Sequence, residues 1–153
     1  MTPRDLYASF AAHEVKYVVI GGVAAARYGL YRVTVDLDIA VEASAANVER
    51  LMQALMDAGM TTASPSAAQD ILRQDITVFD DALRVDVFTR APGLVFAEAW
   101  ARRRTEMVQG VPVHFASLDD LIASKQAAGR PVDLEDVATL RAIAERQAHP
   151  DEE

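Results

Sequence analysis

Two aspartates that are separated by a single residue have the spacing of a metal-binding pair. They are Asp36 and Asp38, in the segment Val35-Asp36-Leu37-Asp38-Ile39, which alternates acidic and apolar residues as a half-buried strand does. On an extended strand, side chains two positions apart lie on the same face, about 6.5 to 7 Å from each other. We therefore expect both carboxylates to face one cavity, while the intervening apolar residues anchor the strand in a core.

A third acid, Asp86, occurs in a second alternating segment, Arg84-Val85-Asp86-Val87-Phe88. If this strand lies beside the first one, the three carboxylates share a cavity, and their like charges repel strongly unless a cation neutralises them. Mg²⁺ is the natural candidate because it prefers carboxylate and phosphate oxygens and usually retains water. The sequence therefore predicts a metal site formed by Asp36, Asp38 and Asp86, with Mn²⁺ as the alternative ion.

A glycine pair, Gly21-Gly22, is separated from Asp36 by thirteen residues and could hold phosphate. The pair separates an apolar segment that reads as a strand, 15–20, from a helical segment, 23–28. Backbone N–H groups at such a turn can reach phosphate oxygens because no side chain blocks the approach. The chain has neither the Walker lysine nor the three-glycine dinucleotide fingerprint, so we expect neither a P-loop nor a Rossmann site.

The order of helical and strand patterns predicts a mixed α/β (α+β) fold. Its expected form is a twisted sheet of about four or five strands flanked by helices, with a helical carboxyl-terminal portion. Strands are predicted over 15–20, 34–41, 76–79, 83–88, 106–108 and 111–115, with a polar loop over 61–70. Helices are predicted from Thr2 to Ala12, over 23–28, from Ser44 to Gly59, up to Trp100, from Ser117 to Gly129, and after a capping box at Asp133 and Asp136.

Length and composition bound the class of protein. A chain of 153 residues is expected to form one domain, with a sheet-containing core over 1–116, carboxyl-terminal helices over 117–147 and a flexible tail over 148–153. Cysteine is absent, the amino terminus does not read as a signal peptide, and the longest apolar stretch, 17–26, is too short to cross a membrane. We therefore expect a cytoplasmic protein without membrane contact.

A net charge of −8 disfavours a broad nucleic-acid surface, although a local basic patch stays open. The cluster Arg102-Arg103-Arg104 is interpreted as a solvated helix end. Lys125, one of two lysines in the chain, could neutralise phosphates from a late helix or could equally be a solvated helix residue. Arg32 is a comparable phosphate candidate, Arg130 is a weaker one, and Asp133 is interpreted as a helix cap.

The glycine pair, the aspartate pair and the later acid resemble, in order and spacing, the signature of the nucleotidyltransferase superfamily of the polymerase-beta type. The segments Gly21-Gly22-Val23-Ala24 and 32–39 look most like the AbiEii-like abortive-infection toxins and small bacterial relatives. In the late helices of that branch, Leu-x-x-x-Lys is often followed by Gly-Arg-x-x-Asp. Leu121 to Lys125, Gly129-Arg130 and Asp133 fit this pattern.

The resemblance implies the chemistry of an Mg²⁺-dependent transferase. Asp36 and Asp38 would bind two Mg²⁺ ions together with a nucleoside triphosphate, and Asp86 would help to bind one ion and activate the acceptor hydroxyl. Gly21, Gly22, Arg32, Thr34, Lys125 and Arg130 are then the expected nucleotide- and phosphate-binding residues.

The biological setting stays open at this point. An RNA end, a small molecule or a protein is the candidate acceptor, and the resemblance adds a toxin role with a cognate antitoxin as partner. The alternative is a non-catalytic module that keeps the fold and senses nucleotides or binds a partner. Met52, Met56, Leu94 and Trp100 are interpreted either as core or as the surface of a homodimer.

Overall fold

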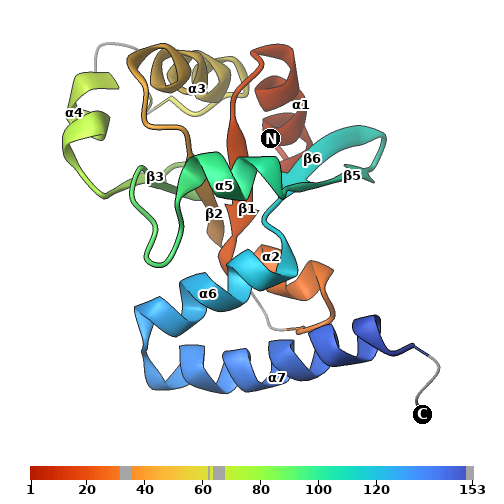
Figure 1. The fold of residues 1–153 in the computed structure, drawn as a ribbon. Helices are drawn as coiled ribbons and strands as arrows, with labels where there is room; N and C mark the ends of the chain where they lie inside the picture. Colours follow the sequence, from red (N-terminus) through yellow and green to blue (C-terminus); the bar gives the residue numbers. More distant parts are fainter. Residues whose placement is uncertain (32–35, 62, 64–67, 151–153) are drawn as a thin grey trace.

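A six-stranded mixed sheet forms the centre of the computed structural model, which describes residues 1–31, 36–61, 63 and 68–150 (Figure 1). Its strands run in the order β3-β4-β2-β1-β6-β5, with parallel pairs β1/β6 and β2/β4 and antiparallel neighbours elsewhere. The predicted mixed sheet is confirmed. It is larger than expected because both predicted hairpins join the same sheet. The strands are β1 Tyr17–Ile20, β2 Asp36–Val41, β3 Ile76–Asp80, β4 Arg84–Phe88, β5 Arg104–Val108 and β6 Val111–Phe115.

The helices surround the sheet unevenly. They are α1 Pro3–Ala12, α2 Gly21–Arg27, α3 Ala45–Asp57, α4 Ala68–Arg73, α5 Phe96–Ala101, α6 Leu118–Ala128 and α7 Pro131–Ala148. Figure 1 shows α1, α3 and α4 at the top of the view, whereas α6 and α7 lie side by side at the bottom, beyond the end of β1. None of the helices in the described part of the chain has the length and apolar composition that a bilayer span needs.

Local capping explains where three of the helices begin and where one of them ends. Thr2 and Asp5 form the predicted capping box of α1, and the hydroxyls of Ser44 and Ser117 accept a hydrogen bond from the first turns of α3 and α6. Gly129 ends α6 in the left-handed conformation, with φ of 70°, where a residue without a Cβ is favoured.

Among the predicted boundaries that differ from the structure, three belong to the helices α2, α4 and α7. Helix α2 begins at Gly21 and not at Val23, so the glycine pair forms the first turn of the helix. Helix α4 occupies the end of the predicted polar loop, because its buried Ala68 and Ile71 pack in the main core with Leu72 against it. Helix α7 begins at Pro131, since proline is well suited to the first position of a helix, and this makes Asp133 its third residue.

The two faces of the sheet are covered to different depths. Leu37, Ile39 and Val41 of β2 point into the main core under α1 and α3, as predicted from their alternation. The opposite face carries only a small cluster in which Val18, Ile20, Ala40 and Ala116 pack with Ala99 of α5. Asp36 and Asp38 alternate with the core residues and therefore lie on this thinly covered face.

The four residues that were interpreted as either core or dimer surface differ in how deeply they are buried. Met52 is fully buried and belongs to the core, whereas Met56 is exposed. Leu94 and Trp100 are partly buried against the small cluster beneath α5. All strands of the described chain precede α6 and α7 along the sequence. The end of the predicted tail, 151–153, lies outside the described residues.

Candidate active site

Parallel pairing of β2 and β4 brings the predicted acids together. In this register Asp38 lies opposite Asp86 and Asp36 lies opposite Arg84. Because opposite residues of neighbouring strands point to the same face, the carboxylates of Asp36, Asp38 and Asp86 share the thinly covered face of the sheet. The third acid is therefore adjacent to the first two, as the sequence pattern required.

Arg84 lies beside two of the acids. Its Nε is 3.2 Å from Oδ1 of Asp86 and 3.6 Å from Oδ2 of Asp36. The guanidinium therefore supplies positive charge where a cation is expected. Among the described residues, no three acidic or histidine side chains are arranged to hold a single metal ion. The donors are the carboxylate oxygens that Mg²⁺ prefers, so the donor chemistry fits this ion.

The crowding of the acids changes the proton affinity of Asp38. The pKa of Asp38 is raised to about 7 by four causes, which are, from the largest, its burial, the negative charge of Asp86, a hydrogen bond to Asp86 and the charge of Asp36. The positive charge of Arg84 opposes them and lowers the pKa. Near neutral pH, Asp38 is therefore poised between its protonated and ionised forms. A bound cation would favour the ionised form.

Gly21 is in direct contact with this carboxylate. Its φ is +68°, and a Cβ placed on it would overlap Oδ2 of Asp38. Only a residue without a side chain permits both the left-handed backbone and the close approach. The glycine that the sequence marked as a phosphate-binding turn thus lies against the acid cluster, at the end of β1 where Ile20 pairs with Asp38.

A cavity of about 360 Å³ lies between the end of the sheet and the carboxyl-terminal helices. Gly21 and Asp38 line its sheet side, and Lys125, Arg130 and Asp133 line the opposite side from α6 and the start of α7. Residues that are about 90 positions apart in the sequence therefore converge on one cavity. The volume falls within the range of small-molecule sites, which is roughly 300 to 1,000 Å³.

The two predicted cations of this cavity are both paired with acids of α7. Nζ of Lys125 lies 3.0 Å from Oδ2 of Asp136, and both side chains are largely buried. Lys125 is therefore not a solvated helix residue. Arg130 is bidentate on Asp133, with distances of 2.7 and 3.2 Å, and its guanidinium keeps the pKa of Asp133 below its usual range. Asp133 also accepts from the backbone N–H of Arg130. It therefore takes part in capping α7, but as the third residue of the helix and not as the cap residue of the predicted box with Asp136.

Three other residues that were predicted to bind phosphate are not among the described residues that line the cavity. Gly22 lies in the first turn of α2 but is not among the residues that line the cavity. Arg32 and Thr34 lie outside the described residues.

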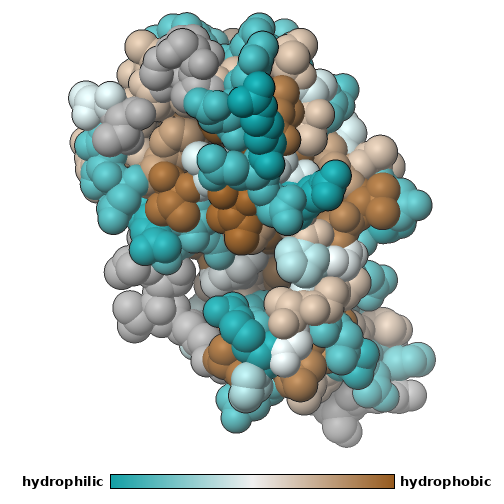
Figure 2. Space-filling model, turned by 90° about the vertical axis from the view of Figure 1, so that its left-hand side faces the viewer, coloured by the Kyte–Doolittle hydropathy of each residue, from teal (hydrophilic) through white to brown (hydrophobic). Residues whose placement is uncertain are grey.

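Several site residues were not anticipated from the sequence. Arg84 precedes Asp86 by two positions on one strand face, so the same alternation that selected Asp86 could have selected it. The cavity also has an apolar wall made by Ile76, Phe88, Pro92 and Leu121. Ile76 and Val78 of the edge strand β3 are about half exposed, and Figure 2, which views this side of the molecule, shows apolar patches among hydrophilic surface above the carboxyl-terminal helices.

Comparison with known proteins agrees with the fold. A family model described as a nucleotidyltransferase of unknown function (DUF6036) matches residues 9–146. An antigenic nucleotidyltransferase-like protein from Paracoccidioides brasiliensis has a similar crystal structure, with a TM-score of 0.52 and 15% sequence identity over 92% of this chain and 77% of that one. A comparison with curated proteins gave no match. The likeness in structure concerns the fold alone.

Replacement of Gly21 by alanine should destabilise the protein more than the same change at Gly110. Both glycines have positive φ, of +68° and +81°, but only at Gly21 does a Cβ meet another side chain. We expect Gly110→Ala to cost about 1 kcal/mol and Gly21→Ala about 3 kcal/mol in the free energy of unfolding, measured by urea denaturation. Equal losses would mean that Gly21 and Asp38 are not in contact.

The raised pKa of Asp38 predicts a pH-dependent stability in the absence of divalent metal. The folded state binds the Asp38 proton more tightly than the unfolded state, so the stability that this proton contributes is complete below about pH 4 and is lost as pH rises through about 7. Asp38→Asn should match the parent at pH 4 and exceed its unfolding free energy at pH 8 by roughly 2 kcal/mol, after allowance for solvent screening. Urea denaturation in EDTA at both pH values measures this difference.

The exposed Asp70 provides the matched control, because Asp70→Asn should shift stability little and equally at both pH values. If Asp38→Asn behaves like this control, the carboxylates are not crowded as described.

Proposed function

Because the chain belongs to the family of nucleotidyltransferases of unknown function (DUF6036), we propose that it transfers a nucleotide from a nucleoside triphosphate to an acceptor hydroxyl. The observation that supports this proposal most directly is the register of β2 and β4, which groups three carboxylates on one face of the sheet. One of them, Asp38, lies against Gly21 and lines the cavity. Pyrophosphate would be the second product.

Asp36, Asp38 and Asp86 would hold two Mg²⁺ ions, or Mn²⁺ in their place. When bound, such ions stabilise negative charge on the attacking and leaving oxygens of an in-line displacement. The donor oxygens are present, but Arg84 neutralises Asp36 and Asp86 in the described structure. We propose that Arg84 turns away when these carboxylates become ligands, and that its exposed side chain makes this movement inexpensive.

The proposed reaction combines the transfer of the nucleotide with a proton transfer, and this chain's own residues can perform the proton transfer. The acceptor oxygen attacks the α-phosphorus, the bond from the α-phosphorus to the bridging oxygen breaks, and the electron pair leaves with pyrophosphate. The acceptor's proton passes to Asp86, whose side chain is only 15% exposed. The backbone N–H groups at Gly21 and Gly22, with Lys125, Arg130, Arg32 and Thr34, are proposed to bind the phosphates.

Binding of the triphosphate by Lys125 and Arg130 would require them to exchange partners. Both cations are neutralised by Asp136 and Asp133, and the exposed Arg130 can rearrange more easily than the buried Lys125. We therefore propose that Arg130 contacts phosphate directly, whereas Lys125 mainly contributes positive potential to the cavity. This pairing is also the observation that favours the second candidate, a nucleotide-sensing or partner-binding module without turnover.

The finer assignments extend the proposal. We propose four narrower assignments on the basis of the sequence resemblance and the composition. They are the AbiEii-like branch, a bacterial source, a toxin role with a cognate antitoxin, and a cytoplasmic location. An RNA end, a small molecule and a protein are all retained as acceptors, and the charge of −8 makes an extended RNA surface the least favoured of them. A homodimer remains a proposal.

The proposed activity predicts metal-dependent labelling of an acceptor. Protein incubated with each α-³²P-labelled nucleoside triphosphate, Mg²⁺ and cell extract should transfer label, and Asp38→Asn should reduce the rate by at least about 10²-fold because the ions lose a ligand. Asp70→Asn, a change at an exposed acid of α4, should leave the rate unchanged. EDTA should abolish transfer.

Calorimetry with the same nucleotides separates the two candidate functions. Under the transferase proposal, Mg²⁺-dependent nucleotide binding weakens in Asp36→Asn combined with Asp38→Asn. Nucleotide binding that survives this double substitution, without label transfer by the parent protein, would favour the sensing module and contradict catalysis.

A further inference from the structure

A second cavity lies at the opposite end of β1 from the candidate active site. Its volume is about 560 Å³, and it is bounded by the end of α1, the segment leading into β1, and residues of α3, α5 and β6. Tyr17 begins β1 at this cavity, while Ile20 ends the strand at the other one. Tyr17 and Ile20 are about 10 Å apart along the strand, and the two cavities share no lining residue in the described part of the chain.

One side of this second cavity is cationic. Lys16 and Arg50 line it. Lys16 is paired with Glu42 at 3.5 Å, whereas the described residues place no carboxylate within ion-pair distance of Arg50, so Arg50 carries the positive charge of this side. Arg50 makes one long hydrogen bond, 3.4 Å from Nη2 to Asn47, and its buried Nε has no partner in the described part of the chain. An arginine with unused, partly desolvated donors is suited to a carboxylate or a phosphate.

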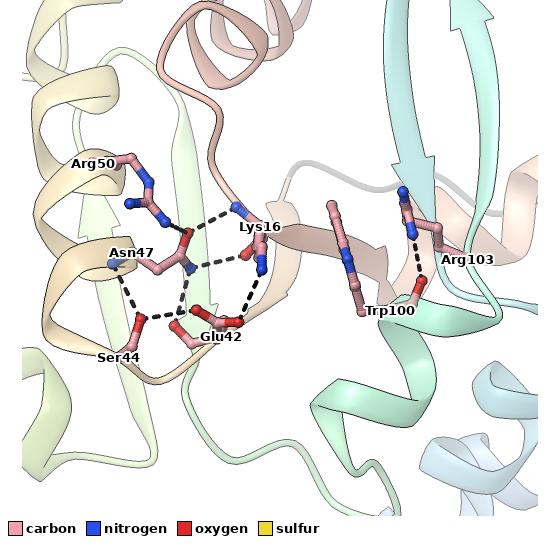
Figure 3. Close-up of polar contacts among 7 residues, drawn as sticks. All are labelled: Lys16, Glu42, Ser44, Asn47, Arg50, Trp100 and Arg103. Atoms are coloured by element: carbon pink, nitrogen blue, oxygen red, sulfur yellow. Dashed lines mark hydrogen bonds and ion pairs between the residues drawn. The ribbon is translucent and has the colours of Figure 1, made fainter.

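Asn47 fixes the position of this cationic side. It is fully buried, accepts from the backbone N–H of Lys16 at 2.8 Å, and donates to the carbonyl groups of Lys16 and Glu42 at 3.0 Å each. Figure 3 shows Asn47 between Lys16 and Arg50, with Ser44 and Glu42 completing the network. The start of β1 is thereby tied to α3, so the cationic side is preorganised.

The other side of the cavity is aromatic. Trp100 of α5 and His114 of β6 line it, with ring centroids 5.1 Å apart in an edge-on arrangement. Arg103 lies over the Trp100 ring, 3.7 Å from its centroid, and Figure 3 shows this arginine on one side of the ring and Lys16 on the other. Burial, followed by the charge of Arg103, lowers the pKa of His114, so this histidine is neutral at physiological pH.

We propose that this second cavity binds a planar aromatic anion, with its ring against Trp100 and its carboxylate or phosphate on Arg50. The volume suits one small ligand, and aromatic walls with a few placed polar groups are typical of such sites. Among the described residues that line the cavity, Glu14 is the one acid, and its side chain is exposed to solvent. This binding site is separate from the proposed catalytic function and does not depend on it.

The test uses the chain's single tryptophan as the reporter, since Trp100 lines this cavity and not the catalytic one. The full chain is titrated in EDTA with AMP and with benzoate, and binding is followed by Trp100 fluorescence and confirmed by calorimetry. Adenosine and benzamide test the ring without the charge, and inorganic phosphate and acetate test the charge without the ring. At least one of AMP and benzoate should bind. It should bind at least about tenfold more tightly than the uncharged compound with the same ring and than the corresponding anion without a ring. Binding of AMP would show that the site recognises a phosphate, and binding of benzoate would show that it recognises a carboxylate.

Variants assign the binding to the cavity. Arg50→Gln should weaken affinity at least about tenfold, Arg50→Lys should retain part of it because the charge remains, and Arg73→Gln on the exposed face of α4 should have no effect. Asp38→Asn should leave this binding intact, which separates it from the catalytic proposal. The inference is overturned if neither AMP nor benzoate binds at millimolar concentration, or if Arg50→Gln, folded by circular dichroism, binds as the parent does.

Discussion

Repulsion among three carboxylates on adjacent strands is the constraint around which this molecule is arranged. Parallel pairing of β2 with β4 puts Asp38 opposite Asp86, and the two-residue alternation adds Asp36 on the same face. Such a cluster is stable only with partial protonation or with nearby positive charge. The structure uses both, since the pKa of Asp38 is raised and Arg84 lies beside the other two acids. A divalent cation would replace both compensations at once.

The unequal covering of the sheet gives this cluster access to substrate. Helices α1 and α3 bury the face that carries Leu37, Ile39 and Val41, which makes β2 a rigid support for its acids. The opposite face has only a small cluster under α5, so cavities can form at both ends of β1. Arg102 at the end of α5 is bidentate on the buried Asp120 of α6, at 2.7 and 3.1 Å. This contact joins the helix beside one cavity to the helix that lines the other.

The sequence predicted what depends on local pattern and missed what depends on tertiary contact. Alternation located β2, β4 and both hairpins, and capping residues located the starts of α1, α3 and α6. Helix α4 buries Ala68 and Ile71, but it has only six residues, and so short a segment gives little periodicity. Likewise, the pairing of Lys125 with Asp136 depends on how α6 packs against α7. The arginine cluster was interpreted as one solvated helix end, yet Arg102 binds Asp120 and Arg103 covers Trp100, because each faces a different element.

The most direct measurement is the pKa of the Asp38 carboxyl group, followed by ¹³C NMR in selectively labelled protein without divalent metal. The structure predicts a value of about 7. Removing the neighbouring charge in Asp86→Asn should lower it, and so should saturating Mg²⁺, since a bound cation stabilises the carboxylate. A value near the ordinary 4 for aspartate, unchanged by Asp86→Asn and by Mg²⁺, would show that the carboxylates do not converge and would contradict the account.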